Sequence, residues 1–175
     1  SYIAASGDGY VYTQPEGKLT ISSDAGFEIV EKYRENPKES GIDGAITEVV
    51  IESAVTAIPA NAFESYQSIK KVTIAEGITS IGESAFFNCS GLTGVTIPDG
   101  VKSIGNAAFS HCTGLQSITI PSSVKSIGKE AFSNCSNLTD IEIPKDVTSI
   151  GDYTFCECLS LTDITIPGKV TSIGS

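Results

Sequence analysis

Five cysteines and a single histidine are the residues of this chain with the most reactive side chains. Four of the cysteines recur at an interval of 23 residues, at Cys89, Cys112, Cys135 and Cys158. A cysteine nucleophile needs a neighbouring base, and the only histidine, His111, occupies a position that is asparagine in two other units. A tetrahedral zinc site needs ligands that converge on one point, whereas a regular interval distributes them along an axis. The pattern therefore argues against both cysteine catalysis and a zinc site.

The interval favours a packing role for these four thiols. A free cysteine behaves as a small apolar side chain and is often fully buried, and Tyr66 stands in the same slot of the first unit. Disulfides between neighbouring units are the alternative, because adjacent strands lie within bonding distance and a secreted protein permits them. Cys156 lies outside the interval, where two other units have serine, so we expect it nearer to solvent. Without a second pair, Cys156-Glu157-Cys158 is only a weak metal or redox signal.

The whole second part of the chain follows the same interval. One unit reads V-x-S-I-G-x-x-A-F-x-x-C-x-x-L-x-x-I-x-I-P-x-x. Five complete copies occupy residues 55–77, 78–100, 101–123, 124–146 and 147–169. A partial copy begins at residue 46, and another ends the chain at residue 175. Repeats of this length predict a solenoid, in which each unit buries its apolar face against its neighbours.

Each part of the unit has an expected structure. The alternation in Leu138–Ile143 predicts a strand with its isoleucines facing inward. Proline follows the strand and turns the chain. The V-x-S-I-G segment returns across the other side, where its glycine is expected to supply a backbone geometry that other residues resist. The A-F-x-x-C segment has the spacing of a turn or a short 3₁₀ segment that directs its phenylalanine inward.

These three segments closely resemble the BspA-like leucine-rich repeat over residues 46–175. The resemblance implies a leucine-rich-repeat solenoid that is right-handed and β-rich. A parallel sheet would lie on its concave face, with turns or 3₁₀ segments on its convex side. Members of the family are typically secreted or surface-displayed proteins of host-associated bacteria and some protists, and are discussed as adhesins. The first unit departs from the pattern, with Pro59 and Ala60 at the glycine step and Tyr66 at the cysteine position.

Residues 1–45 do not follow the repeat and are predicted to form an N-terminal cap of a β-hairpin and a helix. The hairpin turns at residues 15–17, and residues 25–37 have helical spacing with Pro37 just beyond the expected helix end. We expect this cap to dock on Val49 and Ile51, because the end of a solenoid must be sealed from water. The other end stops in mid-unit at Ser175, so we expect the natural chain to continue. That open end also makes end-to-end self-association a possible contact.

Composition excludes several classes of partner. The formal net charge is −10, whereas nucleic-acid binding needs clustered Lys and Arg and anionic lipid repels acidic surfaces. No apolar run reaches the roughly 20 residues of a membrane helix, so no membrane insertion is expected. The chain has no phosphate-binding loop, nucleophile–base pair or metal-ligand constellation. We therefore expect no cofactor and no enzymatic activity.

Function is predicted on the outward side of the strands, which is the concave face of the solenoid that the resemblance implies. One column of that surface contains Val50, Thr73, Thr96, Thr119, Glu142 and Thr165, and its neighbour contains Glu48, Lys71, Gly94, Ser117, Asp140 and Asp163. Such a surface would accept a protein, peptide or glycan, although threonine also favours strands for structural reasons. The carboxylates of Asp140, Glu142 and Asp163 form either a calcium site or, more simply, a solvated face.

Two functions are consistent with this sequence. The first is a non-enzymatic, secreted or cell-surface interaction module, adhesin-like, that binds a host or neighbouring-cell macromolecule. The second is a structural spacer that holds another domain away from the cell and has no ligand of its own.

Overall fold

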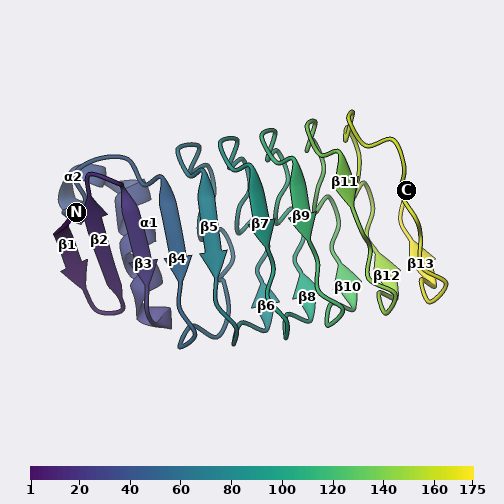
Figure 1. Cartoon of the computed structure of the whole chain (residues 1–175), viewed down its shortest axis with the longest axis horizontal. Coiled ribbons are helices and arrows are strands. Elements are labelled where there is room, and N and C mark those ends of the chain that lie inside the picture. The colour runs from purple at the N-terminus through teal and green to yellow at the C-terminus, as the bar shows by residue number, and fades with distance from the viewer.

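A computed structural model describes residues 1–175 as one elongated stack of coils, with the two ends of the chain at opposite ends of the stack (Figure 1). The N-terminal elements are β1 (Tyr2–Gly7), β2 (Tyr10–Gln14), β3 (Lys18–Ile21), the 3₁₀ turn η1 (Asp24–Gly26), α1 (Phe27–Glu35) and α2 (Pro37–Ser40). All later strands belong to the repeats. The chain is therefore a solenoid with a small cap, as the repeat pattern predicted.

Two sheets run along the stack. The larger has eight strands in the order β1-β2-β3-β4-β5-β7-β9-β11. Its repeat strands are β4 (Glu48–Ile51), β5 (Lys71–Ile74), β7 (Gly94–Thr96), β9 (Ser117–Thr119) and β11 (Asp140–Ile141). The smaller contains β6 (Ser80–Ile81), β8 (Ser103–Ile104), β10 (Ser126–Ile127), β12 (Ser149–Ile150) and β13 (Ser172–Ile173). The V-x-S-I-G segments thus form a second parallel sheet. Each strand residue pairs with the residue 23 positions later, as in Ile127↔Ile150.

The cap continues the larger sheet. The predicted hairpin is β2 and β3, and β3 pairs in parallel with β4 through Leu19↔Val49 and Ile21↔Ile51, which confirms the expected docking. One detail differs from the prediction: an additional strand, β1, pairs antiparallel with β2. Helix α1 ends at Glu35, so Pro37 lies just beyond the helix end as predicted. Pro37 also begins the short helix α2, because proline is well accommodated in a first helical turn.

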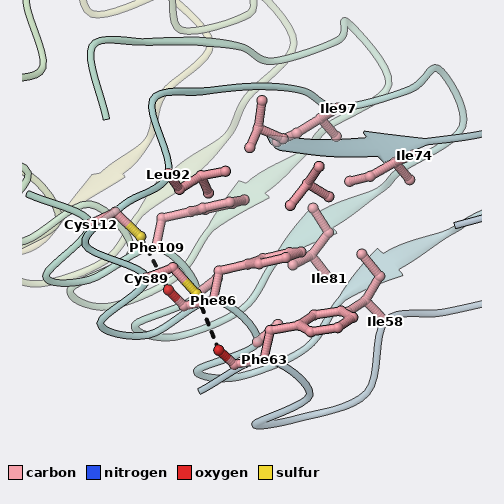
Figure 2. Close-up of a cluster of buried hydrophobic side chains, with 14 of the residues drawn as sticks. Ile58, Phe63, Ile74, Ile81, Phe86, Cys89, Leu92, Ile97, Phe109 and Cys112 are labelled. Atoms are coloured by element: carbon pink, nitrogen blue, oxygen red, sulfur yellow. Dashed lines mark hydrogen bonds between the residues drawn. The ribbon is translucent and has the colours of Figure 1, made fainter. Parts of the chain in front are cut away.

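The interior is a single apolar cluster of 44 buried residues. At its centre the phenylalanines of successive coils stack face to face, with centroid separations from 5.2 Å (Phe86 and Phe109) to 5.9 Å (Phe132 and Phe155). Figure 2 shows Phe63, Phe86 and Phe109 one above another, with isoleucines from both sheets directed toward them. The aligned rings result from the fixed interval, since each unit places its phenylalanine at the same height of its coil.

The A-F-x-x-C segment forms consecutive turns rather than the 3₁₀ segment that was one expectation. Two residues of each turn have positive φ, for example Ser84 (φ 53°) and Asn88 (φ 57°). The alternating backbone directs N–H groups toward the next coil, so Ser84, Phe86 and Asn88 donate to carbonyls 22 residues later. A third ladder of hydrogen bonds therefore runs along the turn side of the stack, in addition to the two sheets.

The glycine of the V-x-S-I-G segment has a different role from the predicted one. None of these glycines has positive φ. A Cβ at Gly105 would instead lie 2.7 Å from the backbone N of Glu83 and 2.7 Å from the carbonyl C of Gly82. The position requires glycine because the preceding coil passes too close for a side chain. Pro59 is accommodated in the first unit because Ile58 bridges only to Ile81, and no earlier coil lies beside it.

Replacement of Gly105 by alanine should therefore lower the free energy of unfolding by about 3 kcal/mol, because overpacking against backbone cannot be relieved by a side-chain movement. Urea denaturation of the purified variant measures the loss. Gly168→Ala is the matched control, since a Cβ at Gly168 would meet nothing within 4 Å. Equal stability of the two variants would show that the close approach does not determine the residue.

Candidate functional site

The four periodic cysteines are interior residues. Cys89, Cys112 and Cys135 are fully buried, and Cys158 is 9% exposed. Each thiol donates a hydrogen bond to the carbonyl oxygen of the phenylalanine in the preceding coil, such as Cys89 Sγ to Phe63 O and Cys112 Sγ to Phe86 O, both at 3.1 Å (Figure 2). This contact explains why a cysteine suits the slot better than a hydrocarbon side chain. The sequence predicted the burial but not the hydrogen bond.

Burial also suppresses the chemistry of these thiols. It raises the pKa of Cys89 to about 12 and that of Cys158 to about 11, from an ordinary value of 9.0. Because the thiolate is the nucleophile and the metal ligand, these groups are poorly suited to either role near neutral pH. Cys156 is exposed, as predicted, and all five cysteines are free thiols in this structure.

The single histidine does contact a hydroxyl. His111 Nδ1 lies 2.9 Å from Ser110 Oγ. The sequence did not suggest this pairing, because the two residues are neighbours in a turn whose residues vary between units. Ser110 is only 1% exposed, so its hydroxyl is not accessible to a substrate. The pair therefore lacks the open approach that a serine nucleophile needs.

The outward side of the larger sheet carries the residues predicted to bind a ligand. Thr73, Thr96 and Thr119 lie on β5, β7 and β9 and are exposed, with Thr96 paired directly to Thr119. In the neighbouring column, Lys71, Ser117 and Asp140 are exposed on β5, β9 and β11. We call this surface, from Lys71 to Asp140, the sheet face.

The last coil does not extend the sheet face as expected. Asp163 and Thr165 belong to a segment with the strand pattern, but residues 161–166 form no strand and make no backbone hydrogen bond with β11. A groove of about 420 Å³ separates the two segments, and its lining includes Asp140, Glu142 and Asp163. These carboxylates do not form a group that would hold a metal ion. Ile164 of this segment is 38% exposed, whereas Ile141, at the equivalent position of β11, is 5% exposed.

Hydrogen bonding distinguishes the threonines of the sheet face from Thr148 and Thr171 of the return segments. The hydroxyls of Thr148 and Thr171, on the return side, each donate to a carbonyl one coil back at 3.3 Å. Thr73, Thr96 and Thr119 make no hydrogen bond within the protein through their hydroxyls, although they have the same interval. The sheet face therefore presents donors and acceptors that the fold itself does not use.

The charge of the sheet face is unevenly distributed. Lys71 lies near the cap and pairs with Glu48 at 3.6 Å, whereas Asp140 and Glu142 lie toward the other end. The central part between them carries only small neutral side chains. A ligand on this surface would therefore meet a polar, uncharged centre with an acidic region on one side.

Comparison with known proteins agrees with this geometry. The pattern described as BspA type Leucine rich repeat region matches in six copies, over residues 44–93 and 56–175. The chain belongs to the BspA-type leucine-rich repeat family. No match was found among curated protein sequences.

Solved structures of leucine-rich repeat proteins resemble this one. The leucine-rich repeat protein of T. pallidum (TpLRR) is 25% identical with a TM-score of 0.68, and the match covers 94% of this chain and 78% of that one. A leucine-rich cell surface protein from Faecalibacterium prausnitzii A2-165 is 28% identical with a TM-score of 0.59, over 94% and 55% of the two chains. The pneumococcal vaccine antigen PcpA is 25% identical with a TM-score of 0.59, over 75% and 33%.

These matches support a repeat module of the kind that binds proteins. The chain spans 55% of the F. prausnitzii protein and 33% of PcpA, so it corresponds to only part of those relatives. None of its helices is long and apolar enough to cross a membrane.

Proposed function

We propose that this BspA-type module is a non-enzymatic, secreted or cell-surface protein that binds a host or neighbouring-cell macromolecule through its sheet face. The ligand is a protein or a glycan. The observation that carries the proposal is the row of exposed hydroxyls from Thr73 to Thr119, which makes no hydrogen bond within the fold.

Three further features support this assignment. Parallel strands in register hold the row rigidly, so a ligand would not have to order it on binding. Solenoids commonly bind through one extended regular surface. Two of the similar structures are described as a cell surface protein and a vaccine antigen, which supports the proposed location.

Bulky charged residues on the sheet face should abolish binding. We expect Thr96→Arg combined with Thr119→Arg to reduce binding of the labelled protein to fixed epithelial cells at least 10-fold, a loss of about 1.4 kcal/mol. The guanidinium groups would occupy the central, uncharged part of the face. Circular dichroism and urea denaturation establish that the variant remains folded, as expected for substitutions of exposed side chains.

A control variant distinguishes the effect of substituting the sheet face from the effect of adding positive charge. Thr113→Arg with Ser122→Arg adds the same charge at two exposed residues outside both sheets and should bind like the natural sequence. If the sheet-face variant also bound normally, the alternative of a structural spacer would be favoured. If both variants lost binding, net charge rather than the sheet face would be responsible.

A further inference from the structure

Each repeat unit has a row of backbone carbonyls on its turn side. In the units after the first, three carbonyls, two residues apart, accept hydrogen bonds from N–H groups of the preceding unit, as Ala85 O accepts from Phe63 at 2.7 Å. The equivalent carbonyls of the first unit belong to Ala60, Ala62 and Glu64, and none of them has a donor within the protein. Ala62 is only 7% exposed, and buried carbonyls are nearly always paired. The first unit therefore presents three unused acceptors.

Helix α1 lies alongside the turn that carries this carbonyl row. The Phe27 ring is 6.1 Å from the Phe63 ring, and the Tyr33 ring stacks on the Tyr66 ring at 5.8 Å. The Tyr66 hydroxyl donates to Val30 O. The N–H groups in the middle of a helix donate to carbonyls of the same helix, so α1 has none to offer its neighbour. The helix therefore covers the rings of the first unit and leaves its carbonyl row unpaired.

A groove remains between α1 and this turn. Arg34 lines both of its parts, which have volumes of about 380 Å³ and about 230 Å³. Ala60 and Ala62 line the larger part, and Glu64 lines the smaller one. The two parts therefore follow the carbonyl row along the turn. We call them together the cap groove.

Hydrogen-bond acceptors dominate the cap groove. Glu28 and Glu31 line its larger part and Glu64 its smaller part, and none of these three carboxylates is in an ion pair. The only cation in the lining is Arg34, whose guanidinium donates to Asn61 O rather than to a carboxylate. The fold thus already places one guanidinium against a carbonyl of this turn and leaves the other acceptors free.

We propose that the cap groove binds a basic peptide segment of a partner protein through its arginine or lysine side chains. Guanidinium and ammonium groups have donors and no acceptors, so they complement a lining of carbonyls and carboxylates in both hydrogen bonding and charge. The half-buried rings of Phe27 and Tyr33 also line the groove, and such rings attract cations and pack against their aliphatic stems. This site is separate from the sheet face and goes beyond the proposed function.

The arrangement suits a peptide better than a metal ion. A calcium ion needs six to eight oxygens that converge on one point. The carbonyls of the row are instead spread along the turn, since their counterparts in the next unit accept from three different residues, Asn61, Phe63 and Ser65. No group of carboxylates in the chain is arranged to hold a metal ion.

Fluorescence anisotropy with a labelled peptide of alternating arginine and serine tests the proposal. We expect Glu28→Gln combined with Glu31→Gln to weaken binding of this peptide about 10-fold, because two charge pairs are lost. Glu35→Gln combined with Glu39→Gln is the matched control. It removes the same charge from two exposed residues of the cap that do not line the groove, and it should bind like the natural sequence.

Arg34→Gln should have the opposite effect. Removal of the only cation in the groove should strengthen binding of the basic peptide about 3-fold, whereas a site for an anionic ligand would lose affinity. Nuclear magnetic resonance locates the peptide, because each carbonyl shares its peptide group with the next amide nitrogen. We therefore expect the amide nitrogen shifts of Asn61, Phe63 and Ser65 to change when the peptide is added.

Each outcome decides for or against the cap groove. Binding that changes these three shifts and is weakened by the groove variant but not by the control would support the proposal. Equal weakening by both variants would overturn it, because net charge would then be responsible. Absence of binding, or binding that leaves the three shifts unchanged, would also overturn it. Calcium chloride that produced the same shift changes without peptide would replace the proposal with a cation site.

Failure of this proposal can be told apart from failure of the proposed function. The variant with Thr96→Arg and Thr119→Arg changes the sheet face and leaves every residue of the cap groove intact. It should lose binding to cells and still bind the basic peptide. The variant with Glu28→Gln and Glu31→Gln should show the reverse.

Discussion

Replacement of Phe109 by alanine is expected to lower the free energy of unfolding by about 4 kcal/mol, as is typical of a buried phenylalanine. Phe109 is fully buried and stacks between Phe86 at 5.2 Å and Phe132 at 5.7 Å. The fixed backbone ladders on three sides prevent the coils from collapsing into the space left by the ring. Urea denaturation at neutral pH, followed by circular dichroism, measures the loss.

Phe155→Ala provides the comparison. Its ring contacts only one stacked neighbour and is only partly buried, so its removal should cost about half as much. The two variants delete the same atoms from the same slot of the repeat and differ only in the presence of a following coil. Equal losses would mean that the column of rings contributes little through stacking between coils.

Alkaline pH is expected to destabilise the protein steeply through the four buried thiols. Each has a pKa that burial raises above its ordinary value of 9.0, to about 12 for Cys89 and about 11 for Cys158, and upward also for Cys112 and Cys135. The folded state therefore retains four protons that the unfolded state releases. The stabilisation is complete below pH 9 and is lost as the pH rises toward the folded pKa values.

The size of the effect follows from linkage. Each retained proton lowers the free energy of unfolding by about 1.4 kcal/mol per pH unit, so four thiols give about 5 kcal/mol per unit between pH 10 and 11. Urea denaturation across pH 8–11 measures this slope. The double variant Cys112→Ala, Cys135→Ala lacks two of the four buried thiols. The thiol contribution to its slope should therefore be about half of that in the natural sequence. An unchanged slope would assign the alkaline loss to tyrosines or lysines instead.

The sequence by itself determined the solenoid and most of its interior. A 23-residue interval maintained by Ile, Phe and Cys cannot be satisfied by an isolated unit, because one unit has no interior of its own. That argument correctly predicted the stack and the exposure of Cys156. It also predicted the burial of the four periodic cysteines, Cys89, Cys112, Cys135 and Cys158. It worked because each of these properties depends on where a residue lies within its own coil, and the repeat makes that position visible.

Only the tertiary structure decided the contacts that adjacent coils make with one another. The glycine at Gly105 is required by the backbone of the preceding coil, the thiol of Cys89 bonds to Phe63 O in the coil before it, and residues such as Ser84 adopt positive φ to pair with the coil after it. Residues 161–166 form no strand beside β11, which removes Asp163 and Thr165 from the sheet, and the repeat pattern of that segment gave no sign of this difference. These features involve groups 22 to 26 residues apart, and their geometry depends on the separation of adjacent coils, which no spacing within one unit specifies.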